Sequence, residues 1–310
     1  MQGFESLQGH RKQLLTMNKV IEIRWHGRGG QGAVTSAELI ALAAIREGRF
    51  AQAFPSFGPE RRGAPVMAFN RISESEHIRV RSAITQPDIV VVLDPGLLDI
   101  IDVTSGLKDG GTLIVNSSKP LVDIRSEFGG SWQLAVVNAT AIALAILKAP
   151  IVNTTMLGAL VKATGVIELD SLPNLLEERF GGLAEGNIEA CHKAFEETSI
   201  AEPSLISKRP EKAYAKEKWP SWQELAPGCV VTEPGNAKSY RSGDWRAQRP
   251  MWDHDRCIKC GICSLFCPEG CVSQNEQGYF EADYYYCKGC GICARECWTQ
   301  AITMVAEAKE

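Results

Sequence analysis

Apolar and polar positions follow two alternating periods through residues 18–200. Apolar runs with the strand pattern stand at residues 20–25, 66–72, 89–93, 112–115 and 134–137. Apolar residues at helical spacing occupy residues 33–47 and 140–147, and residues 154–198 look helical, with breaks at Gly165 and Gly181–Gly182. Strands that alternate with helices form right-handed βαβ units. The pattern therefore predicts an α/β doubly wound, Rossmann-like domain over residues 18–200.

The rest of the chain carries other patterns. Residues 201–250 show no periodicity but hold six prolines and three tryptophans. We expect an extended connector packed against its own domain or a partner, with a solvated linker as the alternative. Residues 251–310 are too few for a large core, and a domain of about 60 residues usually needs a staple such as a metal. Residues 1–17 form an extension that is an ordered arm, a disordered segment or a misassigned start.

Charge and apolar run length exclude two classes of partner. The chain has 33 Lys and Arg against 37 Asp and Glu, a net charge of −4, so no overall basic field favours nucleic acid. Its longest apolar runs, at 89–93 and 141–147, are far shorter than the roughly 20 residues of a membrane helix. The first 17 residues contain no apolar core of signal-peptide length. We therefore expect a cytoplasmic chain with reduced thiols and no membrane contact.

Cysteines change this ordinary picture. Nine of the eleven lie between residues 257 and 297. Eight of them form two runs of identical spacing, C-x2-C-x2-C-x3-C, the second 30 residues after the first. This is the pattern of bacterial two-cluster ferredoxins, in which the fourth cysteine of each run ligates the other cluster.

The spacing predicts two [4Fe–4S] clusters in a small α+β ferredoxin-like domain over residues 251–310. Three thiolates on a short turn cover one face of a cubane, and the fourth has to come from elsewhere. Zinc is the alternative, but zinc motifs usually show two cysteine pairs separated by about 12 or more residues. The first cluster is assigned Cys257, Cys260, Cys263 and Cys297. The second cluster is assigned Cys287, Cys290, Cys293 and Cys267.

Three other cysteines are not assigned as ligands. Cys271, four residues after Cys267, is read as a small apolar residue beside the cluster in preference to a ligand. Cys191 and Cys229 are read as ordinary thiols. Trp298 stands where the first run has Pro268, which removes a rigid turn but no ligand.

A glycine loop follows the first predicted strand and opens the first predicted helix. It consists of Gly27, Arg28, Gly29, Gly30, Gln31 and Gly32. This G-x-G-x-x-G pattern brings backbone close to a phosphate at a helix N-terminus. The acidic residue that binds a dinucleotide's ribose is absent about 20 residues later, which argues against NAD. An anion, a partner contact and a simple strand–helix turn remain open.

A second glycine-bounded loop spans residues 56–63 and contains Arg61 and Arg62. Adjacent arginines suit a phosphate or a carboxylate, and they suit an interdomain salt bridge equally well. The sequence leaves both alternatives open.

Three segments together resemble the 2-oxoacid:ferredoxin oxidoreductase family. They are HGRGGQG at 26–32, AQAFPSFGPERRGAPV at 51–66 and the double cysteine block. The resemblance covers residues 18–305 and is to a gamma subunit fused to a delta, ferredoxin-like subunit. It implies thiamine diphosphate with Mg2+ on partner alpha and beta subunits, an external ferredoxin as acceptor and a dimer of heterotrimers. This chain would hold no catalytic residue and would not act alone.

Within the family, the oxalate-oxidising members, which work without coenzyme A, are our first expectation. Pyruvate or another 2-oxoacid with coenzyme A is the alternative. Two other classes stay open: a ferredoxin-linked reductase with NAD(P) or flavin, and a non-catalytic structural adaptor.

We expect about eight iron atoms and eight acid-labile sulfides per chain after anaerobic purification, because two cubane clusters contain that many. Elemental analysis and a sulfide assay measure both. Iron near zero with stoichiometric zinc would contradict the cluster assignment.

Overall fold

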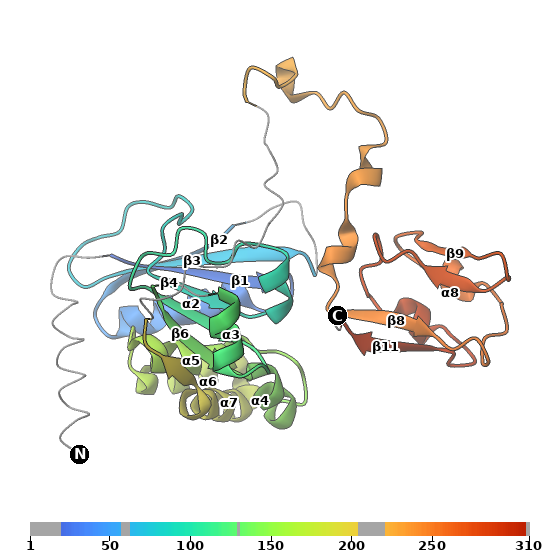
Figure 1. Ribbon diagram of the computed structural model, residues 1–310. Helices are drawn as coiled ribbons and strands as arrows, with labels where there is room; N and C mark the ends of the chain where they lie inside the picture. The colour runs from blue at the N-terminus through green and yellow to red at the C-terminus, as the bar shows by residue number, and fades with distance from the viewer. Residues whose placement is uncertain (1–19, 57–62, 129–130, 204–220, 308–310) are drawn as a thin grey trace. The chain divides into compact units, whose positions relative to one another are not determined.

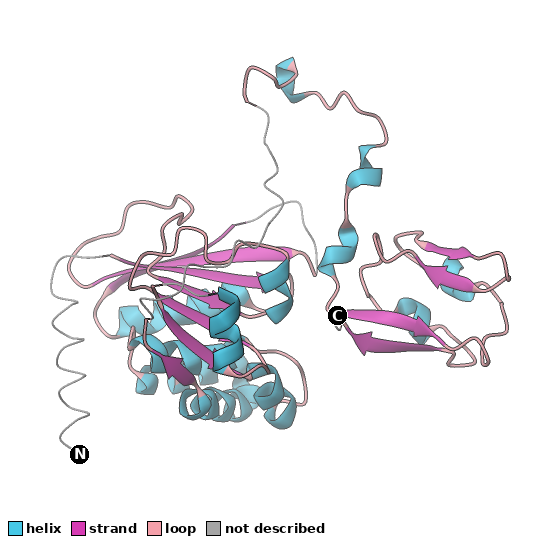
Figure 2. Cartoon of the chain, viewed as in Figure 1, coloured by secondary structure: helices cyan, strands magenta, loops and turns pink. Residues whose placement is uncertain are grey.

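The computed structural model describes residues 20–56, 63–128, 131–203 and 221–307. The chain divides into two compact units, residues 1–60 with 65–212 and residues 61–64 with 213–310. Each unit is described by itself (Figures 1 and 2). Arg61 and Arg62, singled out from the sequence, lie outside the described residues.

A seven-stranded sheet forms the centre of the N-terminal unit, in the order β2-β3-β1-β4-β5-β6-β7. The four strands β1, β4, β5 and β6 are parallel, and β2, β3 and β7 pair antiparallel at the edges. The predicted α/β fold with a mostly parallel sheet is confirmed. The strands are β1 (Ile21–Arg28), β2 (Phe50–Ser56), β3 (Pro65–Ser73), β4 (Ile89–Val92), β5 (Thr112–Asn116), β6 (Gln133–Val137) and β7 (Ser199–Ala201).

Two strands were not predicted from the sequence. Strand β2 contains Pro55, which cannot donate to a ladder, and it lies at the sheet edge, where proline is tolerated. Strand β7 has only three residues, too few to show a period.

Helices cover both faces of this sheet. The α-helices are α2 (Ala33–Arg46), α3 (Leu121–Phe128), α4 (Ala139–Ile146), α5 (Asn153–Thr164), α6 (Pro173–Phe180) and α7 (Ala184–Glu197). The larger apolar core packs α2 and α4–α7 against one face, and a smaller core packs α3 and the short helix at Pro95–Asp99 against the other. No helix in the described ranges is long and apolar enough to cross a membrane.

Close backbone packing joins α5 and α7. Gly158 faces the carbonyl of Cys191, and a Cβ at this position would lie 1.9 Å from that oxygen. Cys191 is 1% exposed, and burial raises the pKa of its thiol to about 12. This cysteine is therefore a buried, protonated core residue.

The C-terminal unit is built from two similar halves. Strands β8 (Gln248–Trp252) and β11 (Ile302–Ala306) pair antiparallel, as do β9 (Val272–Gln274) and β10 (Phe280–Ala282). The short helices α8 (Ile262–Leu265) and α9 (Ile292–Arg295) lie 30 residues apart in the chain. Among described residues its buried core holds only Cys263, Val272, Cys293 and Ile302.

Gly158→Ala is expected to lower the free energy of unfolding of the N-terminal unit by about 2–3 kcal/mol, because overpacking forces α5 and α7 apart. In an unconstrained helix the same change would stabilise by about 1 kcal/mol. Gly182→Ala is the control, since its Cβ would meet nothing within 4 Å. Calorimetric unfolding of the two variants measures the effect, and equal stabilities would contradict this packing.

Candidate functional site

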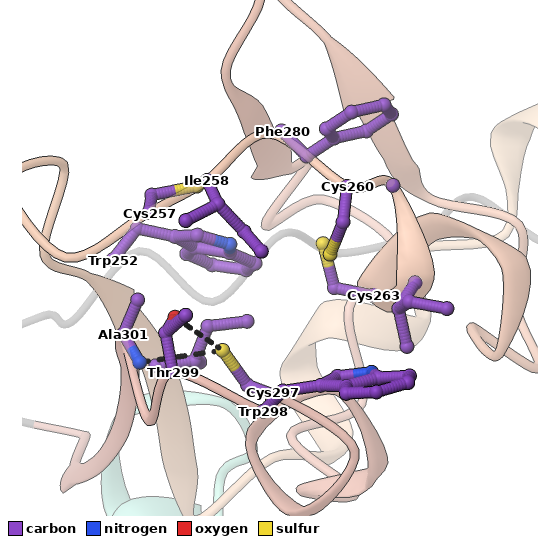
Figure 3. A pocket seen from close by; sticks show the side chains of 13 residues that line it. Trp252, Cys257, Ile258, Cys260, Cys263, Phe280, Cys297, Trp298, Thr299 and Ala301 are labelled. Atoms are coloured by element: carbon purple, nitrogen blue, oxygen red, sulfur yellow. Dashed lines mark hydrogen bonds between the residues drawn. The ribbon is translucent and has the colours of Figure 1, made fainter.

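The first hollow of the C-terminal unit is lined by the thiols of Cys257, Cys260, Cys263 and Cys297. Its volume is about 380 Å3, and Trp252, Phe280 and Trp298 complete its wall. Figure 3 shows the sulfur atoms of Cys260, Cys263 and Cys297 turned toward the middle. Three thiols come from the first cysteine run and the fourth from the second.

Left-handed backbone bends the chain around this hollow. Lys259 and Gly261 have φ values of 58° and 76°, and α8, with Cys263, begins directly afterwards. A Cβ at Gly261 would lie 3.2 Å from the Phe280 ring. Positive φ and close packing together explain why glycine stands between the second and third thiols.

Cys297 differs from the other thiols of the first hollow in its hydrogen bonds. The Ala301 backbone N–H donates to its sulfur at 3.2 Å, and the Thr299 hydroxyl lies 3.6 Å away. Burial alone would raise the pKa of Cys297, but hydrogen bonds from Thr299, Ala301 and nearby backbone outweigh it and lower the pKa. Burial raises the pKa of Cys263 on the opposite wall.

A second hollow of about 340 Å3 lies in the other half of the unit. Its wall includes Pro250, Gly289 and Gly291. The thiols that line it are those of Cys267, Cys271, Cys287, Cys290 and Cys293. Here too a single run supplies three thiols at the predicted spacing, and Cys267 comes from the other run.

Cys271, which the spacing leaves without a role, lines the second hollow. Its sulfur lies 3.6 Å from that of Cys267, and it is also hydrogen-bonded to Cys287. This hydrogen bond is the main cause that lowers the pKa of Cys287 to about 6 and raises the pKa of Cys271. Burial raises the pKa of Cys293 to about 12.

The thiols of each hollow are spread around its wall. Within the described ranges, no group of three His, Cys, Asp or Glu side chains is close enough to hold a metal ion. The thiols instead surround a space that a multinuclear group would fill. Sulfur-rich donor sets of this kind suit iron–sulfur clusters and other soft metals.

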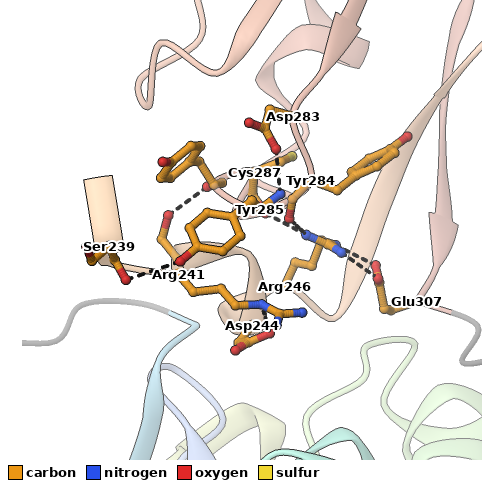
Figure 4. Close-up of polar contacts among 11 residues, drawn as sticks. Ser239, Arg241, Asp244, Arg246, Asp283, Tyr284, Tyr285, Cys287 and Glu307 are labelled. Carbon is orange, nitrogen blue, oxygen red and sulfur yellow. Dashed lines mark hydrogen bonds and ion pairs between the residues drawn. The ribbon is translucent and has the colours of Figure 1, made fainter. Parts of the chain in front are cut away.

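Arg246 holds the connector against the loop that leads into the second cysteine run (Figure 4). Its guanidinium pairs with both Glu307 oxygens at 2.7 and 2.8 Å, and it donates to the carbonyls of Tyr284 and Cys287. The Ser242 hydroxyl donates to the Tyr286 carbonyl at 2.7 Å. Sequence reasoning missed Arg246, and its only signal was the basic, tryptophan-bearing composition of the connector.

The glycine loop of the N-terminal unit makes a tight turn from β1 into α2. Gly32, with φ 82°, caps α2, and a Cβ there would lie 2.7 Å from the Asn153 amide. The Gln31 amide donates to Asp94 at 2.6 Å, and Arg28 pairs with Asp94 at 3.2 Å. Arg28 is 4% exposed. These side chains therefore join the loop to its own sheet.

His26 precedes this loop on β1 and is 4% exposed. Burial, with a smaller effect of Arg24, lowers its pKa to about 3. The imidazole is therefore neutral at pH 7.

Family models match both units. The model described as pyruvate ferredoxin/flavodoxin oxidoreductase matches residues 22–197. A 4Fe-4S binding domain model matches residues 250–273, which contain the first cysteine run.

Similar proteins match the chain over about three fifths of its length. The pyruvate/ketoisovalerate oxidoreductases common subunit gamma of Thermococcus kodakarensis is 53% identical over 185 residues, which cover 59% of this chain and 100% of the relative. Pyruvate synthase subunit PorC of Methanothermobacter thermautotrophicus is 52% identical, covering 57% and 96%. The crystal structure of pyruvate oxidoreductase subunit PORC from Thermotoga maritima superimposes with a TM-score of 0.53 at 39% identity, covering 59% and 99%.

Arg246→Ala is expected to destabilise the C-terminal unit by about 2 kcal/mol, because Glu307 and two carbonyls lose a partly buried cationic partner. Arg241→Ala is the matched control. The Arg241 side chain is 63% exposed and pairs with Asp244, so its loss should cost less than about 1 kcal/mol. Calorimetry of the full chain resolves the two units, and equal effects of the two variants would contradict the role of Arg246.

Proposed function

Because the chain belongs to the pyruvate ferredoxin/flavodoxin oxidoreductase family, we propose that it is the subunit through which electrons leave a 2-oxoacid:ferredoxin oxidoreductase complex. It is a gamma-type subunit of such an oxidoreductase, with a 4Fe-4S binding region near its C-terminus. The observation that carries the proposal is the pair of thiol-lined hollows in the C-terminal unit.

Two [4Fe–4S] clusters, when bound, supply one-electron transfer at low potential. The first hollow would hold one through Cys257, Cys260, Cys263 and Cys297. The second would hold the other through Cys287, Cys290, Cys293 and Cys267. In each hollow the fourth thiol joins the two cysteine runs, so cluster binding and folding of this small unit are coupled.

The apolar walls suit electron transfer with little reorganisation of water. Trp252 and Phe280 shield the first hollow, while Trp298 is 77% exposed at its rim. Hydrogen bonds such as that from Ala301 to Cys297 tune the potential, because they stabilise the more negative, reduced state.

Pyruvate or another 2-oxoacid is our proposed substrate class, in preference to the oxalate expected from the sequence. The relatives are named for pyruvate and ketoisovalerate, and this supports the alternative reading. Oxidative decarboxylation of a 2-oxoacid with coenzyme A yields an acyl-coenzyme A, CO2 and two electrons. Single-electron carriers accept these electrons one at a time.

Partner subunits complete the proposed assembly. Alpha and beta chains would hold thiamine diphosphate with Mg2+ and the substrate, and an external ferredoxin would accept the electrons. The relatives' names, common subunit gamma and subunit PorC, support a complex of several chains. We propose a dimer of heterotrimers.

Anaerobic turnover of the whole complex tests this function. We expect ferredoxin reduction with pyruvate or another 2-oxoacid that requires coenzyme A and the partner chains. Cys260→Ser should lower the rate by more than about tenfold, since even loss of an outer-shell partner of a metal site costs about 10- to 100-fold. Cys191→Ala, which removes a thiol of the N-terminal unit, should retain the rate.

Turnover by this chain alone would overturn the subunit role. Oxalate oxidation without coenzyme A would restore the first substrate expectation. An additional chromophore, or bleaching of the clusters by NAD(P)H, would favour a self-contained reductase.

A further inference from the structure

The repeat in the C-terminal unit places Cys271 opposite Ala301. Left-handed residues recur 30 positions apart, with φ 59° at Gly270 and 53° at Gln300. The residues that follow them accept equivalent hydrogen bonds, from Asp283 N to the Cys271 carbonyl at 2.8 Å and from Asp253 N to the Ala301 carbonyl at 2.7 Å. The two halves thus offer the same backbone site with different side chains.

The Cys271 thiol lies among the proposed ligands of the second hollow. It is 8% exposed, lines the hollow and lies 3.6 Å from the Cys267 sulfur. In the first hollow, Ala301 contributes only its backbone N–H to Cys297, at 3.2 Å. The second hollow therefore contains a side-chain S–H at a position where the first has a methyl group.

The direction of the Cys271–Cys267 hydrogen bond follows from ligation. A cysteine that ligates iron does so as a thiolate and carries no proton. Cys267 would then be an acceptor only, and the shared hydrogen belongs to Cys271. A bond to a thiolate is stronger when the cluster carries an additional electron.

We propose that Cys271 is a positioning residue that donates an S–H hydrogen bond to the Cys267 thiolate and thereby raises the reduction potential of the second cluster. This inference rests on the proposed function, and it deepens that function by assigning a role to the cysteine that is not a ligand. It makes the two clusters chemically unequal, although their ligand spacing is identical.

Three variants of the full chain in its complex test the proposal, followed by anaerobic redox titration with electron paramagnetic resonance detection. Cys271→Ala should retain iron and sulfide at the wild-type level. One of the two reduction steps should become about tenfold less favourable, which is about 59 mV for one electron. Cys271→Ser keeps a donor and should restore most of the shift.

Ala301→Cys is the reciprocal variant. It introduces the thiol into the first half, where Cys271 shows that the backbone site accepts cysteine. We expect the other reduction step to become more favourable while the step affected by Cys271→Ala stays in place. Two variants that move different steps assign each step to a cluster.

Two outcomes would overturn the inference. Loss of half the iron in Cys271→Ala would make Cys271 a ligand, and unchanged potentials with full iron content would leave it a packing residue. Failure of the proposed function has a separate signature, because the wild-type complex would then contain no iron–sulfur signal at all.

Discussion

Thiols from the two halves of the C-terminal unit meet at each hollow, and the arrangement of that unit depends on this exchange. Its apolar core is small among the described residues, and two of the four buried members are themselves proposed ligands, Cys263 and Cys293. A domain of this size has little burial to offset its conformational entropy. Metal–thiolate bonds that connect residues of opposite halves supply the missing cohesion. The same side chains would therefore serve both folding and electron transfer.

The connector extends this stabilisation beyond the two cysteine runs. Arg246 and Ser242 bind the backbone of residues 284–287, just before and at Cys287. Glu307 pairs with the Arg246 guanidinium from the end of the described chain. The position of the second run is thus determined by contacts to segments far away in sequence. This gives the prolines and tryptophans of residues 201–250 a context that a solvated linker would not have.

The N-terminal unit uses a different kind of cohesion. Its parallel strands are buried on both faces, and its glycine loop is joined to the sheet through Asp94. The Arg28 guanidinium, which the sequence offered as an anion or partner contact, is buried and paired with this carboxylate. The loop's geometry is explained by internal packing around Gly32, so the described structure requires no ligand to account for it.

Sequence alone determined the features that depend on local spacing. The x2 and x3 intervals grouped the eight cysteines into two sets, and apolar periodicity predicted the parallel strands and the helices around them. These signals are local because backbone geometry over a few residues sets them. The antiparallel edge strands, the Arg28–Asp94 pair and the role of Arg246 depended on tertiary structure, since each joins residues that no local period relates. Cys271 shows the difference most clearly. Its spacing marked it only as extra, and the fold places its thiol beside Cys267, at the position that alanine occupies in the other half.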